Sequence, residues 1–286
     1  MQRSLIALFG SMVFLALVAL AGLALDPRTI TGAPAFLKPL KFAVSVAIYA
    51  LSFGWLLRFI EGRDRLRRLL GNLTAGILAF EVVLIFLQAA RGVGSHFNVA
   101  TLFDGAVFQA MGVAIAGLSV CQVVAAVLLL RQPFQDPVLA WSLRLGMAIT
   151  ALGGAVGWIM AVHLGHTVGA PDGGAGIPLT NWSTQHGDLR AAHFFGIHAL
   201  QLLPLVAWLA GRLRWLPQEG RARLVMYSGL SYGALLLLLV AQALRGRPLS
   251  ALDGPALLAR GRWGGVTLAL VGRALGSPVR ETPEAA

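Results

Sequence analysis

Residues 105–130 read GAVFQAMGVAIAGLSVCQVVAAVLLL, a long stretch without a single charged side chain. About 20 such residues in a helix cross the roughly 30 Å hydrocarbon core of a bilayer. Six further stretches are similarly long and predominantly apolar, so the predicted spans are residues 4–25, 39–60, 70–90, 105–130, 138–162, 191–211 and 222–244. The sequence therefore predicts an all-α, polytopic membrane bundle of about seven transmembrane helices.

Composition points the same way, because 57% apolar residues, 12% charged residues and a mean hydropathy of +0.75 do not fit one soluble core. The first apolar stretch resembles a secretory signal, but it is longer than a usual signal core, and we expect an uncleaved first helix. The single cysteine, Cys121, lies within the fourth predicted span and is best explained as a small apolar filler.

Basic residues predict the orientation, since arginine and lysine gather in the cytoplasmic loops of membrane proteins. One side of the seven spans holds Arg3, Arg58, Arg63, Arg65, Arg67, Arg68, Arg131, Arg144, Arg212, Arg214, Arg221 and Arg223. The loops of the other side hold only Arg28, Lys38, Lys41, Arg91 and Arg190, although the C-terminal tail, with six arginines, would also lie there. We expect a cytoplasmic N-terminus and an inner-membrane location. The formal charge of +11 then reflects contact with the lipid bilayer and needs no nucleic acid.

Residues 1–248 form the predicted transmembrane domain, and residues 249–286 form a C-terminal tail. The apolar part of the tail, residues 263–275, is too short to span the bilayer, which favours an amphipathic segment at the membrane interface. An eighth, partly inserted helix is the alternative. Residues 277–286 are expected to be disordered.

The three outer, periplasmic loops are longer and more varied than the inner ones. They cover residues 26–34, 91–98 and 163–188, and a loop as long as the last is usually functional or disordered. Their acidic and basic residues are numerous enough to pair, so we expect a compact cap over the bundle. The polar residues expected to support this outer face are Lys41, Arg91, Asp104 and Arg190.

Several polar residues fall inside the predicted spans. Counting about 1.5 Å per residue from the outer ends puts Tyr49, Glu81, His198 and Gln201 at similar depths, and Gln88 shares a helix face with Glu81. A carboxylate near the bilayer centre is costly unless it is neutralised. The sequence thus predicts a shared interior site in which Glu81 accepts protons or binds a ligand; a structural lock between helices is the alternative.

Histidines near the outer face suggest a metal. His163 and His166 would point the same way if the fifth helix continued through them, and a zinc or iron site could join one of them to His193, with His96 or Asp188 completing it. His163 and His193 could also face each other across a non-covalent haem near the outer surface. Hydrogen-bonding histidines without a cofactor are the alternative.

Sequence blocks in this chain resemble an uncharacterised family of bacterial multi-pass inner-membrane proteins. The blocks are KPLKFA at 38–43, FE and QAARG within 80–92, SHFN at 95–98, HTVG at 166–169, NWST at 181–184 and GDLRAAHF at 187–194. The resemblance implies the membrane location and brings no activity. A looser similarity to seven-helix zinc hydrolases lacks their His-x-x-x-His pair, since His193 and His198 are five residues apart, so it assigns no catalytic role.

Three functional hypotheses follow. The leading one is a metal or haem protein with redox or hydrolytic chemistry at the outer face. The second is a proton-coupled carrier or receptor that binds a small molecule and uses Glu81. The third is an accessory membrane subunit without activity of its own. The oligomeric state stays open.

Overall fold

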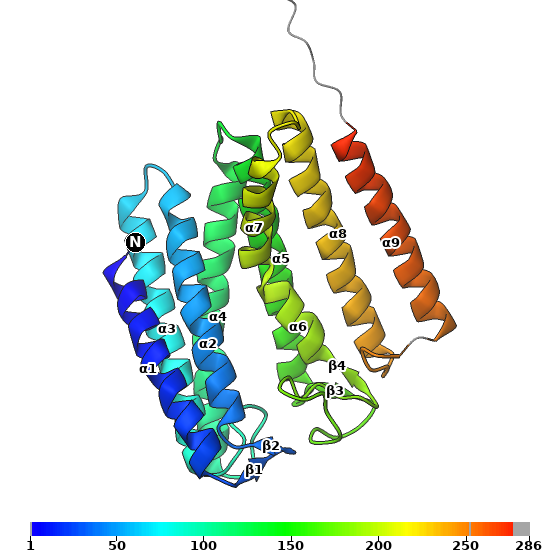
Figure 1. Ribbon diagram of the computed structural model, residues 1–286. Helices are drawn as coiled ribbons and strands as arrows, with labels where there is room; N and C mark the ends of the chain where they lie inside the picture. The colour runs from blue at the N-terminus through cyan, green and yellow to red at the C-terminus, as the bar shows by residue number, and fades with distance from the viewer. Residues whose placement is uncertain (1, 252, 277–286) are drawn as a thin grey trace, which may run out of the picture.

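The computed structural model describes residues 2–251 and 253–276, which fold into a bundle of long helices with two small hairpins at one end (Figure 1). The helices are α1 (Arg3–Leu25), α2 (Leu37–Leu56), the short 3-10 helix η1 (Leu57–Phe59), α3 (Asp64–Ala90), α4 (Leu102–Arg131), α5 (Pro137–Val162), α6 (Leu189–Ile197), α7 (Ala199–Arg212), α8 (Gln218–Leu244) and α9 (Gly254–Leu275). The hairpins pair β1 (Thr29–Ile30) with β2 (Ala33–Pro34), and β3 (Thr167–Val168) with β4 (Gly187–Asp188).

Within the described residues, six helices are long and apolar enough to cross a membrane: α1, α2 together with η1, α3, α4, α5 and α8. The bent pair α6 and α7 makes a seventh if it counts as one span. The predicted all-α helical bundle is confirmed, and these helices suggest a multi-pass membrane protein. Its orientation and its membrane stay predictions.

The sixth predicted span is not one helix. α6 and α7 meet at His198 with a bend of 47°, where a continuous helix over residues 191–211 was expected. Beside the bend, the Phe195 carbonyl accepts a hydrogen bond from a side chain of α8: Tyr232 Oη donates to it at 2.7 Å. The protein therefore supplies at the bend a hydrogen bond that an apolar bilayer could not supply.

Helix α5 contributes buried residues to two hydrophobic cores of the bundle and so connects them. Its buried Leu143 and Met147 belong to the core shared by α1 to α4, whereas Ile149, Val156 and Met160 belong to the core shared with α6 to α8. α5 and α6 approach most closely at Gly153 and Gly196, where a Cβ on Gly196 would lie only 2.3 Å from the Gly153 Cα. Small residues at this crossing let the two backbones touch.

Helix α9 lies antiparallel beside α8 (Figure 1). Trp263 Nε1 donates to the Ser231 carbonyl at 2.9 Å, the Thr267 and Ser231 hydroxyls are 2.6 Å apart, and Arg260 donates to Gln242 Oε1 at 2.7 Å. α9 is not among the helices apolar enough to span alone. The interfacial position expected for residues 263–275 stays a prediction, and the disorder expected for residues 277–286 lies outside the described residues.

One end of the bundle carries a cap, made of residues 26–36, 91–101 and 163–188. The cap loops contact each other and the helix ends. Gly32, at φ 74°, lies so close to Gly173 that a Cβ on it would be 2.8 Å from the Gly173 carbonyl oxygen, and Arg28 donates to the Ala90 carbonyl at 3.1 Å. These contacts make the compact cap that the paired charges predicted.

Candidate functional site

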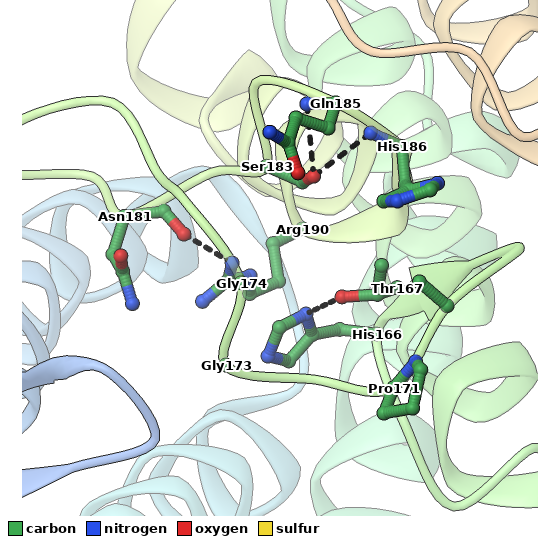
Figure 2. Close-up of a pocket in the computed structure, with 11 residues that line it drawn as sticks. His166, Thr167, Pro171, Gly173, Gly174, Asn181, Ser183, Gln185, His186 and Arg190 are labelled. Carbon is green, nitrogen blue, oxygen red and sulfur yellow. Dashed lines mark hydrogen bonds between the residues drawn. The ribbon is translucent and has the colours of Figure 1, made fainter.

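The cap contains a cavity of about 220 Å³. Figure 2 shows His166 and Arg190 side by side, between the loop of Gly173 and Gly174 and the segment from Ser183 to His186. Asn181 and Gln185 complete the polar part of the wall. These hydrogen-bonding groups share the wall of the cavity with Ala170, Pro171 and the two glycines, and its size suits a small molecule.

Asp188 and Arg190 anchor this site to the start of α6. Asp188 is the N-cap of α6 and accepts the Arg190 backbone N–H at 3.0 Å, while its carboxylate pairs with the Arg190 guanidinium at 2.6 and 3.0 Å. The Asp188 carboxylate also accepts the Ser183 N–H at 2.8 Å, and Arg190 donates to the Asn181 carbonyl. Burial acts to raise the pKa of Asp188, but the hydrogen bonds and charge of Arg190 outweigh it and hold that pKa below its usual range.

His166 is held from the opposite side by Asp172. The Asp172 carboxylate accepts the Thr167 N–H at 2.8 Å and the His166 N–H at 3.2 Å, and His166 Nδ1 lies 3.2 Å from Asp172 Oδ1 and 3.8 Å from Asp188 Oδ1. Burial, helped by the charge of Arg190, lowers the pKa of His166 to about 4. The imidazole is therefore neutral near pH 7 and can both donate and accept a hydrogen bond.

The structure separates His163 from His166. Helix α5 ends at Val162, His163 is its exposed C-cap, and Leu164 turns the chain with φ 51°. α5 thus ends where the predicted fifth span ends, and the condition for aligning the two histidine rings is not met, because this left-handed residue ends the helical spacing.

His193 lies deeper than expected and does not face His163. Its Nδ1 donates to the Gly153 carbonyl at 2.8 Å, and its ring lies against Gly157. Gly157 and Gly153 precede His163 by six and ten residues of α5, or about 9 to 15 Å along the axis. The expectation that the two histidines share one outer level, as a haem between them would need, is therefore wrong.

His96 lies where the cap meets the bundle. Its Nδ1 is 3.1 Å from the Ser95 hydroxyl, and its ring packs 5.7 Å from the ring of Phe42. Burial, with smaller effects of Lys38 and His193, holds the pKa of His96 well below its usual range. His96 is thus a neutral residue within electrostatic range of both α2 and α6.

Across the described ranges 2–251 and 253–276, no three or more His, Cys, Asp or Glu side chains are grouped so that they could hold a metal ion. The predicted set of His96, His163, His166, His193 and Asp188 is spread over several neighbourhoods: only His166 and Asp188 are close, and Arg190 occupies the Asp188 carboxylate. Zinc, iron and haem therefore stay predictions that this geometry does not support.

The interior polar residues do not form one hydrogen-bonded cluster. Tyr49 Oη accepts from Gln122 at 3.1 Å, whereas Glu81 is only 2% exposed and lies within electrostatic range of Lys38. His198 stands at the bend between α6 and α7, one turn from Gln201. Within the described chain Glu81 Oε1 has no hydrogen-bond partner, whereas His198 Nε2 and Gln201 Oε1 lack one of ordinary geometry although the His198 and Gln201 side chains interact with each other.

The outer-face residues Arg91, Asp104 and Lys41 join elements together, and Gln88, which was predicted to belong to the interior site, bonds to Asp104 of this group. Gln88 donates to Asp104 Oδ1 at 2.9 Å, Thr101 donates to Asp104 Oδ2 at 2.7 Å, and Arg91 pairs with the same carboxylate, so this group ties α3 to α4. Lys41 Nζ donates to the Thr180 carbonyl at 3.1 Å and ties α2 to the cap. Gln88, Arg91, Asp104 and Lys41 thus have structural partners of their own.

Sequence reasoning left several residues out of the site. Three of them line the cavity: Asn181, Ser183 and His186. The other two are Lys38 and Asp172, and Lys38 lies within electrostatic range of both Asp172 and Arg190. One signal was present for Lys38: it precedes Lys41 by three residues, so both fall on one face of the outer end of a predicted helix.

No family model, no curated protein and no solved structure matches this chain. The resemblance to bacterial inner-membrane proteins accordingly stays a prediction.

Proposed function

We propose that this protein is a proton-coupled membrane carrier for a small polar molecule, which enters through the cap and reaches a transfer site beside His198. The break between α6 and α7 is the observation that carries this proposal. Substrate sites of many carriers are built from interrupted transmembrane helices, because the interruption exposes polar groups in the middle of the bundle.

Unmet hydrogen-bonding capacity supports the transfer site. A buried polar atom without a partner costs on the order of 1 to 3 kcal/mol. Glu81 Oε1 on α3 is such an atom, and His198 Nε2 at the α6–α7 bend and Gln201 Oε1 on α7 lie near each other's side chains without a hydrogen bond of ordinary geometry. A polar solute or water in contact with these atoms would recover that energy, which an apolar filler could not.

A series of polar side chains supports a route from the cap to this site. Lys38 lies within electrostatic range of Arg190 and His166 in the cap and of Glu81 in the interior. His96 lies within range of Lys38 and His193, and His193 within range of His198. Lys38 and these three histidines keep partial solvent accessibility although protein surrounds them.

Cysteine accessibility tests the route. In a background where alanine replaces Cys121, Gln201→Cys should react with a membrane-impermeant, negatively charged thiosulfonate added from the cap side. Leu202→Cys is the matched control, because Leu202 is the next residue of α7 and, at 37% exposure, lies on the outside of the bundle.

We expect Gln201→Cys to react at least about ten times faster than Leu202→Cys. Equal rates, or no reaction at Gln201→Cys, would remove the route and with it the carrier.

A further inference from the structure

Two polar side chains of the cap cavity, His166 and Arg190, lie side by side in its wall (Figure 2). Each is fixed by an acidic residue that stands behind the wall in the described chain, His166 by Asp172 and Arg190 by Asp188. The contacts that fix the two side chains also determine which of their atoms are left for a bound molecule.

His166 is left with one hydrogen-bond acceptor. Its Nδ1 lies 3.2 Å from Asp172 Oδ1 and 3.8 Å from Asp188 Oδ1, and an ionised carboxylate only accepts, so the ring hydrogen lies on Nδ1. Because burial lowers the pKa of His166 to about 4, the ring is neutral near pH 7 and Nε2 is an acceptor. Among the described residues no group donates to this Nε2.

Arg190 is left with one pair of donors. Its Nε donates to Asp188 Oδ1 at 3.0 Å, and its Nη2 donates to Asp188 Oδ2 at 2.6 Å and to the Asn181 carbonyl. These bonds use the hydrogens of Nε and Nη2, and the two hydrogens of Nη1 have no partner in the part of the chain that the structure describes. The wall therefore presents an acceptor and a donor next to each other.

The rest of the wall limits the size and the charge of what can bind. Ala170 and Pro171 offer apolar side chains, and the two glycines offer none. A cavity of about 150 Å³ holds benzene, so this one of about 220 Å³ can hold a six-membered ring with a small substituent. Of the Asp, Glu, Lys and Arg residues in the described chain, Arg190 alone lines the cavity, and Asp188 balances its charge. The wall thus favours a small uncharged ring.

We propose that the cap cavity binds a small uncharged cyclic amide, a lactam or a pyrimidine base, through its neighbouring N–H and C=O groups. This inference rests on the proposed carrier function and names the class of molecule that the cap admits. The amide N–H donates to His166 Nε2, and the carbonyl oxygen accepts from Arg190 Nη1.

The ring is part of this recognition. A ring holds the amide cis, so that N–H and C=O lie on the same edge and can meet adjacent partners. An open-chain secondary amide is trans and presents the two groups on opposite edges. The carbon atoms of the ring then lie against the apolar part of the wall.

The experiment measures dissociation constants of the full chain in detergent at neutral pH, from the dependence of its unfolding temperature on ligand concentration. The probes are δ-valerolactam, which is the lactam, and uracil, which is the pyrimidine base. The N-methylated form of each keeps the carbonyl oxygens and loses the N–H groups. Sodium valerate has the same number of carbon atoms as the lactam but carries a negative charge.

Two variants remove the proposed partners one at a time. His166→Asn keeps an amide near the position of Nδ1 and lacks Nε2, and Arg190→Lys keeps a positive charge beside Asp188 and lacks Nη1. His163→Asn is the matched control, because it makes the same substitution at an exposed cap histidine outside the cavity wall.

We expect the lactam or uracil to stabilise the wild type and His163→Asn, and the tighter of the two identifies the source of the ring. Its N-methylated form and valerate should bind at least about tenfold more weakly, because a hydrogen bond is lost or an extra charge must be buried. His166→Asn and Arg190→Lys should each weaken binding at least about tenfold.

Three results overturn the proposal: no binding of either ring, equal binding of a ring and its N-methylated form or valerate, and undiminished binding in His166→Asn. Should a variant unfold, the comparison of each ring with its N-methylated form decides, since it needs the wild type alone.

Two outcomes separate this proposal from the carrier function. If Gln201→Cys is accessible and neither ring binds, the carrier stands and its substrate belongs to another class. If a ring binds as described and Gln201→Cys is inaccessible, the cap holds a cyclic amide and the carrier falls.

Discussion

Replacing Gly153 by alanine tests whether the α5–α6 crossing holds the bundle as described. A Cβ at this position would lie 2.5 Å from the Gly196 carbonyl carbon and 2.6 Å from both the Gly196 Cα and the Ile197 nitrogen. Carbon atoms in comfortable contact are about 3.5 to 4.0 Å apart, so α6 would have to move by about 1 Å. Because all three obstructing atoms belong to the backbone, no side chain can rotate away.

Overpacking of this kind costs about 1 to 3 kcal/mol. Alanine in a helix recovers about 0.5 to 1 kcal/mol relative to glycine. Gly154→Ala is the matched control, because the nearest atom to a Cβ there, Gln122 Oε1, is 3.7 Å away and in ordinary contact. The control should be neutral or slightly stabilised, and the difference between the two variants should be about 1 to 3 kcal/mol.

Equilibrium unfolding in detergent micelles, followed by tryptophan fluorescence, measures this difference directly. The displacement of α6 should also weaken the bond from His193 Nδ1 to the Gly153 carbonyl. If Gly153→Ala is as stable as Gly154→Ala, the close approach of α5 and α6 is incorrect, and the bend at His198 loses its packing partner.

Three further outcomes are expected. His166 has a folded-state pKa of about 4, below the usual 6.5, so the unfolded chain binds more protons than the folded chain between these pH values. The free energy of unfolding should therefore fall on acidification from pH 6.5 to 4. In unfolding measured as a function of pH, His166→Asn should reduce that fall. Asp188→Asn should cost about 2 to 3 kcal/mol by leaving Arg190 without its carboxylate, whereas Asp64→Asn, at an exposed ion pair, should cost less than about 1 kcal/mol; comparable losses would contradict the difference in burial. Ser231→Cys with Thr267→Cys, in a chain without the native cysteine, should form a disulfide that keeps α8 and α9 linked after cleavage of the intervening loop, and persistent separation of the fragments would refute the packing of α9.

The helical spans could be predicted from the sequence because apolar length is a local property. The bend at His198 could not, because its causes are distant in the chain: Gly196 packs against Gly153 of α5, and Tyr232 of α8 satisfies the Phe195 carbonyl. Gly196 and Pro204 flank the bend, but similar residues occur in straight helices too.

The site shows the same division between local and distant causes. The link between Asp188 and Arg190 joins residues two positions apart, and sequence reasoning placed both on the outer face. The contact from Lys41 to Thr180 joins residues 139 positions apart and had no local signal. The alignment of His163 with His166, which required the fifth helix to continue, fails for a local reason, since the helix ends at Val162 and Leu164, between the two histidines, has a positive φ.

The packing of α9 against α8 bears on which side of the membrane each end of the chain lies. α1 begins and α9 ends at the same end of the bundle, opposite the cap (Figure 1). If α9 crosses the bilayer along with its neighbour, the chain makes an even number of passes and returns to the compartment in which it started. Reporter domains fused to either terminus would then give the same topological signal, and a seven-pass protein would give opposite ones.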